Sequence, residues 1–452
     1  MGRGALLIVF MLGACSGGGD PCRGKVQVCD GHIRDADGRA LILRGVNLAG
    51  AHKWAPYFGF QEQADYARVR TDWGLNAARF LLVWAAVEPE QGQYDDDYLD
   101  QVALRLQWAH DAGLSVILDM HQDLYGEGFT GGDGAPRWTC DSAHYDAFVP
   151  RDPWFLGYQD DNVLACVDGF WTSEELQAAY AAAWRHVAER LAGEPAVIGF
   201  DVMNEPHWGT YAITSFEADR LQPMYERVVP EVRAAAPDWI AFLEPSSARN
   251  GGFATGLGVT PLPANVAYAP HSYDFQAESG NGFTPERRQA LIDNAVLLAG
   301  EAQLLGAALW VGEYGGQPDD PGIAEYMDAQ YDAFGAVAAS SMYWSYDRGG
   351  YGLLDADGNE QTALVDVIAR PYAERIAGQP IGWSFDETTS TFELRWHADA
   401  GIAAPTEIVI PSRAYPAGFA VSCGDCSYQE IDQGVQISTP PSGDPAVVTI
   451  SP

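Results

Sequence analysis

Hydrophobic residues along most of the chain gather in short runs, which longer amphipathic stretches separate. The runs have the length of buried strands and cover residues 40–50, 77–84, 115–122, 197–206, 239–245, 266–273, 308–315 and 341–347. The stretches between them, such as 96–113 and 172–193, carry apolar residues at helical spacing. This alternation predicts repeated βα units.

Eight such units close naturally into a (β/α)8 barrel, the TIM barrel of the α/β class. The near-continuous hydrophobicity of the runs is typical of parallel strands that are buried on both faces. Barrels of this kind build their functional sites at the carboxyl ends of the strands. We therefore expect a barrel over residues 22–378 and look for chemistry where its strands end.

The pattern changes after about residue 378. Apolar and polar residues then alternate with a period of two, with Pro and Gly breaks and without a helical run. This is typical of short antiparallel strands. We predict a small antiparallel β-sandwich domain over residues 379–452.

The first 15 residues combine one Arg, a short apolar run and small residues before Cys15. The segment predicts a signal peptide and is too short to span a bilayer as a mature helix. Its ending resembles a bacterial lipobox, in which the Cys is lipidated, and residues 16–21 then form a flexible tether. We expect an exported protein, either a lipoprotein held at the cell envelope through Cys15 or a secreted one; an ordinary signal peptide is the alternative.

Six cysteines remain after Cys15, an even number that suggests disulfides in an exported chain. A metal or redox site is the alternative for the last two, which are spaced Cys-x-x-Cys, but no second Cys pair or His pair accompanies them. Local pairing would give Cys22–Cys29, Cys140–Cys166 and Cys423–Cys426.

The chain is strongly acidic, with 26 basic and 62 acidic residues and a formal net charge of −36. Such a surface repels phosphate backbones and argues against nucleic acid as a partner. The charge is spread along the sequence, so solubility is the simplest explanation. The 14 Trp either pack the core or offer platforms to an apolar or sugar ligand.

Polar and aromatic side chains stand where the predicted strands end: His121, Asp123, Asn204, Glu205, His271, Tyr273, Glu313 and Trp344. An ionised carboxylate at the end of a buried strand is costly unless it is used. Glu205 and Glu313 end the fourth and seventh runs, whose carboxyl ends would face one crevice. Two carboxylates that flank one bond are what glycoside hydrolysis requires, one protonated to donate and one ionised to attack.

The neighbouring residues suit the same chemistry. Asn204 would donate to a sugar 2-hydroxyl, His271 or Tyr273 would hold the ionised carboxylate, and Trp344 would offer an apolar face to a sugar ring. Each also has an ordinary interpretation in core packing. Residues 124–171 are too many for a common βα loop, and we expect them to shape the pocket rather than to be a purely structural excursion.

These residues carry a resemblance to the family 5 glycoside hydrolases, retaining enzymes built on a barrel. The sequence "NEP" around Glu205 and the Glu after "WVG" resemble that family over residues 38–375. The resemblance implies that Glu205 is the acid/base and Glu313 the nucleophile. Further residues that match its active-site pattern are Arg79, His121, His271, Tyr273 and Trp344.

Within this family the chain is most similar to the endoglycoceramidases, in the sequences "LRGVNLAG", "DMHQDLYGEGF" and "DVMNEP" and in the appended sandwich. That resemblance implies cleavage between an oligosaccharide and ceramide, with Lys53 and Asp123 in contact with the sugar. The segment 126–168 departs from the family pattern, so a glycan preference does not transfer.

Three alternatives are weighed against this hypothesis. The same chemistry could act on another β-glucoside, such as a steryl glucoside or an oligosaccharide. A non-catalytic carbohydrate receptor is disfavoured because both carboxylates are present, and a serine esterase because no Gly-x-Ser-x-Gly motif occurs. We expect a monomer that acts on a glycolipid at a membrane surface, with neither a metal nor another cofactor.

Overall fold

The computed structural model describes residues 21–452 of the chain. The predicted signal peptide, Cys15 with its expected lipid, and all but the last residue of the predicted tether lie outside these residues. No helix in the described part is long and apolar enough to cross a membrane.

The centre of the molecule is a closed barrel of eight parallel strands, which confirms the predicted (β/α)8 fold. Each strand pairs in parallel with the next one along the chain, and β11 closes the ring against β4. In chain order the strands are β4 (Arg44–Leu48), β5 (Ala77–Val83), β6 (Ser115–His121), β7 (Val197–Asp201), β8 (Ile240–Leu243), β9 (Val266–Tyr268), β10 (Ala308–Tyr314) and β11 (Ser340–Tyr343).

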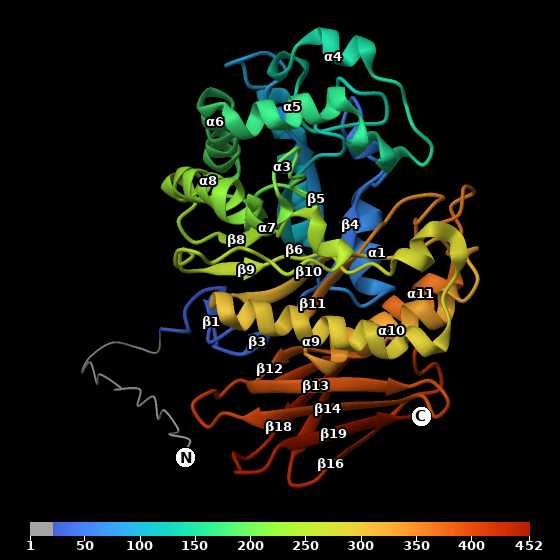
Figure 1. The fold of residues 1–452 in the computed structure, drawn as a ribbon. Coiled ribbons are helices and arrows are strands. Elements are labelled where there is room, and N and C mark those ends of the chain that lie inside the picture. The colour runs from blue at the N-terminus through green and yellow to red at the C-terminus, as the bar shows by residue number, and fades with distance from the viewer. Residues whose placement is uncertain (1–20) are drawn as a thin grey trace, which may run out of the picture.

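Helices surround the barrel (Figure 1). The main ones are α1 (Gln63–Thr71), α3 (Asp96–Asp111), α6 (Glu174–Leu191), α8 (Gln222–Ala235), α9 (Arg288–Leu305), α10 (Ile323–Ala336) and α11 (Thr362–Ile368). Side-chain caps fix two of the helix starts, because Asp95 accepts from the N–H of Tyr98 and Ser173 from that of Leu176. The second cap begins α6 at residue 174, slightly inside the predicted stretch 172–193.

The predicted strand 40–50 is wrong in its extent, because it is two strands that serve two sheets. β3 (Ala40–Leu41) pairs with β12 (Tyr372–Ile376), whereas β4 belongs to the barrel. Between them the N–H of Ile42 donates to the carbonyl of Glu374. Both strands are buried, so the run of apolar residues carries no mark of the change of sheet.

The C-terminal part forms two antiparallel sheets, which confirms the predicted sandwich and lies below the barrel in Figure 1. The larger sheet has the order β1-β2-β3-β12-β15-β18-β17 and the smaller β13-β14-β19-β16. The expected boundary at residue 378 falls between β12 and β13 (Gly378–Asp386), which belong to different sheets. The remaining strands are β1 (Gln27–Cys29), β2 (His32–Arg34), β14 (Thr391–Ala398), β15 (Thr406–Val409), β16 (Ala420–Cys423), β17 (Ser427–Ile431), β18 (Gly434–Ser438) and β19 (Ala446–Ser451).

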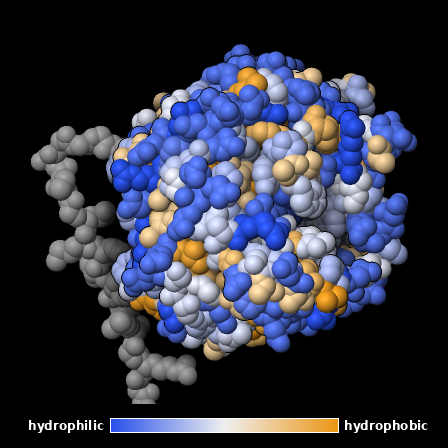
Figure 2. Space-filling model, turned by 90° about the horizontal axis from the view of Figure 1, so that it is seen from above, coloured by the Kyte–Doolittle hydropathy of each residue, from blue (hydrophilic) through white to orange (hydrophobic). Residues whose placement is uncertain are grey.

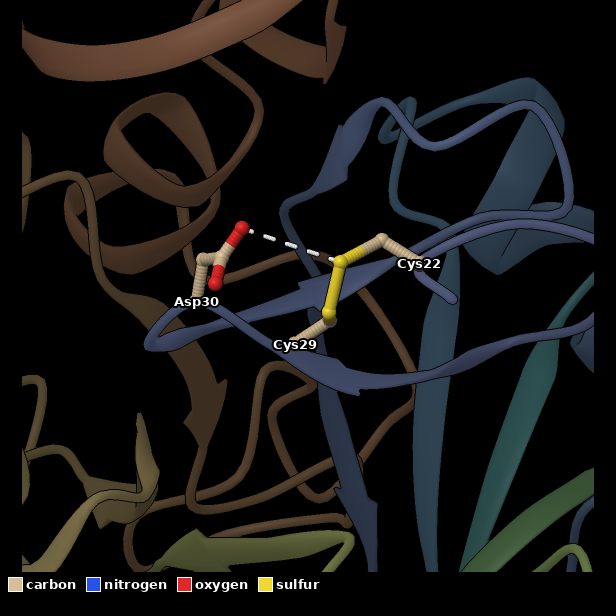
Figure 3. A group of neighbouring side chains, drawn as sticks. All are labelled: Cys22, Cys29 and Asp30. Carbon is tan, nitrogen blue, oxygen red and sulfur yellow. Dashed lines mark hydrogen bonds between the residues drawn. A yellow bond between two sulfur atoms is a disulfide. The ribbon is translucent and has the colours of Figure 1, made fainter. Parts of the chain in front are cut away.

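The three predicted disulfides, Cys22–Cys29, Cys140–Cys166 and Cys423–Cys426, are all present. Figure 3 shows the first of them beside the carboxylate of Asp30, which lies 3.7 Å from Cys22 Sγ. Because both sulfurs are bonded to each other, this group has no thiolate to offer a metal.

The long segment after β6 is folded rather than irregular. It contains η2 (Arg137–Thr139), α4 (Ser142–Ala147), η3 (Trp154–Gln159) and α5 (Asp161–Thr172), and it lies at the end of the molecule away from β13 and β14 (Figure 1). The segment starts with an antiparallel bridge between Asp123 and Asp133. Gly134, with φ of 110°, lets it lie against β6, because a Cβ there would come within 2.4 Å of Gln122 Cβ.

Candidate active site

A fully buried guanidinium, that of Arg79 on β5, organises the carboxyl ends of the strands. Its nitrogens lie 2.8–3.1 Å from side-chain oxygens of Asn47, Asp119, Asp201, Asn204, Glu244 and Glu313. A planar donor fork suits such a ring of acceptors, and burial removes the water that would compete for them. Arg79 therefore fixes the ends of most of the barrel strands relative to one another.

The charges around this guanidinium do not balance if every acid is ionised. Burial, with the nearby Glu244 carboxylate, raises the pKa of Asp201 well above its usual range. Burial also favours the neutral form of Glu244, yet His271 and Arg79 hold the pKa of this carboxyl below its usual value. These opposite shifts favour the negative charge on Glu244 and the proton on Asp201.

Glu313 lies at the end of β10 with both carboxyl oxygens engaged. Arg79 donates to Oε1 at 2.8 Å, and the hydroxyl of Tyr273 donates to Oε2 at 2.9 Å. Nδ1 of His271 is 3.6 Å from the same Oε2. Burial raises the pKa of Glu313, and the positive charges of His271 and Arg79 oppose that rise.

Glu205 follows β7 in a left-handed conformation, with φ of 40°. Its N–H donates to Glu244 Oε2 at 2.8 Å. Its side chain reaches the open crevice, where Oε1 accepts from Asn250 Nδ2 at 2.7 Å and from His271 Nδ1 at 2.9 Å. Two donors on Oε1 leave Oε2 as the oxygen that can carry a proton.

His271 stands between the two catalytic candidates. Its Nδ1 lies 2.9 Å from Glu205 and 3.6 Å from Glu313, so one ring nitrogen is within reach of both carboxylates. Gly312 lets the ring fit there, because a Cβ at that position would lie 3.0 Å from His271 Nε2. Burial lowers the pKa of His271, but Glu244 and Glu313 more than offset this and raise it well above the usual value. These carboxylates favour the imidazolium form, in which Nδ1 donates to Glu205 and Nε2 lies 3.1 Å from Glu244 Oε1.

The remaining predicted residues form a second group beside these two carboxylates. The ammonium of Lys53 contacts Asp123 and lies 3.9 Å from Asp133 and 4.7 Å from the centre of the Trp344 ring. The ring of His121 stacks on Trp344, with centroids 5.3 Å apart. His121 also pairs with Asp119 at 2.7 Å; burial and Lys53 lower its pKa, but this carboxylate raises it to about 9. Positive and negative groups thus line the side of the crevice next to Trp344.

Three side chains of this second group, His121, Asp123 and Asp133, offer ligand atoms within 4.8 Å of one another. A divalent cation would have to share this space with the Lys53 ammonium, which already pairs with Asp123. The positive charges of the cation and of the Lys53 ammonium would repel each other strongly in a buried site. The residues thus fit a lysine-centred sugar site better than a metal site.

A stack of aromatic side chains includes the residues that follow Glu205 in the chain. The ring of His207 stacks on Tyr158 at 4.6 Å and on Trp208 at 4.2 Å. Tyr158 is also 6.4 Å from Trp154, which is about half exposed together with Phe155. A mostly apolar cavity of about 40 Å³ lies behind His207, with Trp171, Phe170 and Met203 in its wall.

The structure brings together all of the predicted site residues and adds others that the sequence analysis did not single out. These are Asn47, Asp119, Gln122, Asp133, Asp201, Glu244 and Asn250. Glu244 had a usable signal, because "FLEP" ends its strand with a carboxylate and Pro just as "NEP" does. Asp133 stands among glycines of the long segment, and only the bridge to Asp123 reveals its place.

A (β/α)8 barrel with two close carboxylates at its carboxyl ends defines the class of barrel glycoside hydrolases. The family model of the cellulases, glycosyl hydrolase family 5, matches residues 34–350, and the C-terminal domain of glycoside hydrolase family 5 matches residues 370–451. The chain belongs to glycosyl hydrolase family 5.

Several individual proteins and one enzyme of known structure are similar to this chain. The chain is 26% identical over 436 residues to endoglycoceramidase I of Rhodococcus hoagii. This alignment covers 90% of the present chain and 82% of the relative. It is similar to the solved structure of endo-glycoceramidase II from Rhodococcus sp., with a TM-score of 0.82 and 34% identity over 93% of this chain and 99% of that one. A shorter match, 33% over 146 residues, is to an ergosteryl-beta-glucosidase of Saccharomyces cerevisiae and covers 25% of this chain and 19% of that one.

Proposed function

We propose that this protein is an endoglycoceramidase, which hydrolyses the bond between the glycan and ceramide of glycosphingolipids and releases the intact oligosaccharide. The observation that carries the proposal is the pair Glu205 and Glu313, which share one imidazole nitrogen of His271. A close pair of carboxyl groups suits double displacement, because the nucleophile must reach the anomeric carbon without an intervening water.

In the first step, Glu313 attacks the anomeric carbon of the sugar next to ceramide. Arg79 and Tyr273 hold its two oxygens and hence aim the carboxylate. At the same time Glu205 transfers the proton of Oε2 to the glycosidic oxygen, and ceramide leaves as the alcohol. The C–O bond to ceramide breaks as the glycosyl ester of Glu313 forms.

In the second step, Glu205 acts as a base. Ionised after the first step, it takes a proton from a water that attacks the anomeric carbon, and the bond to Glu313 breaks. The glycan leaves with retained β configuration, and Glu205 is protonated again. Endo-glycoceramidase II from Rhodococcus sp., for comparison, is among the solved structures as a lactosyl-enzyme intermediate and as a ganglioside GM3 complex.

We place the glycan on the side of Trp344 and Lys53. There the Trp344 ring offers an apolar face, and Lys53, Asp123 and His121 offer donors and acceptors for sugar hydroxyls. Asn204 Oδ1 is taken by Arg79 and its Nδ2 donates to the carbonyl of Gln122, which leaves the second amide hydrogen for the sugar 2-hydroxyl.

We place the lipid on the side of Glu205, because the leaving oxygen that it protonates belongs to ceramide. The stacked rings of Tyr158, His207 and Trp208 and the exposed Trp154 and Phe155 supply apolar surface there. Viewed from above, apolar residues are scattered in small groups over an otherwise hydrophilic face (Figure 2). The export, the lipid anchor at Cys15 and the monomeric state remain parts of this proposal.

Proton NMR of the first product tests the mechanism. The lactose released from lactosylceramide should be the β anomer before mutarotation, and the Glu205→Gln and Glu313→Gln variants should lose turnover. For a Glu313→Gly variant, azide should restore cleavage of an activated lactoside and give a glycosyl azide of inverted configuration. An α product from the native protein, or full activity in the Glu313→Gln variant, would refute the assignment.

A steryl β-glucoside is the second candidate substrate, because the partial match to an ergosteryl-beta-glucosidase points to a different apolar aglycone for the same chemistry. Parallel assays with lactosylceramide and a steryl glucoside at equal detergent concentration separate the two. We expect a kcat/KM that is at least about tenfold higher with lactosylceramide, which corresponds to about 1.4 kcal/mol of transition-state free energy.

A further inference from the structure

Glu244 follows β8 and is a buried carboxylate, 2% exposed, that contacts the peptide of Glu205. Its Oε2 accepts the backbone N–H of Glu205 at 2.8 Å. Its Oε1 lies 3.0 Å from Arg79 Nη2 and 3.1 Å from His271 Nε2. One carboxylate thus contacts the backbone of Glu205 and the ring that donates to the Glu205 side chain.

We propose that Glu244 is a positioning residue for the acid/base Glu205, which it holds by two routes, through the Glu205 peptide and through the His271 ring. This rests on the acid/base role that the proposed function gives to Glu205. Glu244 is buried and acts through these neighbours.

The first route is through the backbone. Glu205 has a positive φ, which costs a residue with a Cβ about 1 kcal/mol or more and persists only where neighbours enforce it. Glu244 accepts the N–H on one side of this residue, and Gln122 Nε2 donates to its carbonyl at 3.1 Å on the other. The strained turn directs the Glu205 side chain out of the sheet and into the crevice.

The second route is through the imidazole. With Glu244 at Nε2, the ring is fixed so that Nδ1 donates to Glu205 Oε1. Asn250 donates to the same oxygen. Both donors leave Oε2 to carry the catalytic proton. The negative charge of Glu244 beside Nε2 favours the doubly protonated ring, in which Nδ1 also keeps its proton. A neutral residue at 244 would free the ring to lose a proton and to turn.

A Glu244→Gln variant tests this through its dependence on the leaving group. Two aryl β-lactosides serve as substrates. One releases 2,4-dinitrophenolate, which leaves without being protonated; the other releases 4-methylumbelliferone, a poorer leaving group that depends more on protonation by the general acid. We expect kcat/KM to fall about 10²-fold for the methylumbelliferyl substrate and less than about tenfold for the dinitrophenyl substrate, since general acid catalysis contributes about 10²–10⁴-fold. Damage to the fold alone would lower both values alike.

Two controls separate the possible failures. Glu374→Gln changes an equally buried carboxylate on β12, which pairs with Arg70 at 2.6 Å outside the site, and should leave the ratio of the two kcat/KM values unchanged. Glu205→Gln should show the same leaving-group dependence as Glu244→Gln. If Glu205→Gln lacks it, the proposed acid/base role is wrong; if only Glu244→Gln lacks it, the positioning role is wrong.

A measurement without turnover gives an independent check. In ¹⁵N NMR spectra of histidine-labelled protein at pH 7, His271 should carry protons on both nitrogens in the native protein. In the Glu244→Gln variant, the His271 ring should lose one of these protons as the pH is raised, before pH 8 is reached. A ring that stays doubly protonated in the variant, together with an unchanged leaving-group ratio, would overturn the inference.

Discussion

The carboxyl group of Asp133 is 1% exposed, and in the described structure neither of its oxygens accepts a hydrogen bond. The ammonium of Lys53 lies 3.9 Å away, but Asp123 already contacts it. Burial raises the pKa of Asp133 to about 7, with a further rise from Asp123 that Lys53 and His121 oppose. We predict that replacement by Asn stabilises the protein, and that it does so only above acidic pH.

The sign follows from proton linkage. A carboxyl whose folded-state pKa lies above its unfolded value binds more protons when folded, so the folded state loses stability as the pH rises from about 4 to about 7. A shift of about three pKa units, at about 1.4 kcal/mol each, corresponds to at most about 4 kcal/mol at pH 8 and to almost nothing at pH 4. Asn keeps the size of the side chain and cannot ionise.

Urea unfolding followed by tryptophan fluorescence at pH 4.5 and pH 8 measures this difference. The control is Asp160→Asn, a mostly buried acid of the same long segment that caps α5 and lies away from Lys53. It should change stability little at either pH, because Asn caps a helix about as well as Asp. A gain for Asp133→Asn that is equal at the two pH values, or absent at pH 8, would refute the linkage reasoning.

Three further predictions concern the catalytic carboxylates and the long segment. Tyr273→Phe removes the hydroxyl that donates to Glu313 at 2.9 Å. A hydrogen bond to a charged group is worth about 1.5–3 kcal/mol, so kcat/KM should fall about 10- to 100-fold. Burial raises the pKa of Glu313, and this carboxyl must be ionised to attack. As the pH is lowered, kcat/KM should therefore begin to fall before pH 4.5, the ordinary pKa of a Glu carboxyl, is reached. A kcat/KM that stays constant down to that pH would contradict this. Changing Cys140 and Cys166 together to Ser should cost about 3 kcal/mol of unfolding free energy in calorimetry, and an unchanged melting temperature would show that the segment holds without its disulfide.

Much of the fold could be predicted because the barrel strands are buried on both faces and therefore stand out as apolar runs. Tyr273 and Glu313 could be assigned to one crevice because parallel strands of a closed barrel end on the same side. The three disulfides join cysteines close in sequence, so local pairing was the natural prediction. The prediction of a single strand over residues 40–50 was wrong, because a change of sheet between two buried strands does not alter the hydrophobic pattern.

The parts of the site that the sequence does not reveal depend on contacts between several strands. Glu244 matters because Arg79, His271 and the peptide of Glu205 converge on it, and these come from three other places in the chain. Asp133 matters because a bridge sets it beside Asp123. A carboxylate inside an apolar or glycine-rich stretch carries no sign of its partners until the fold is known.

Mass spectrometry of the products formed from lactosylceramide in mild detergent tests the central proposal most directly. We predict intact lactose and ceramide, with neither product formed by the Glu313→Gln variant. Galactose and glucosylceramide would contradict it, because they would place the scissile bond between the two sugars instead of between the glycan and the lipid.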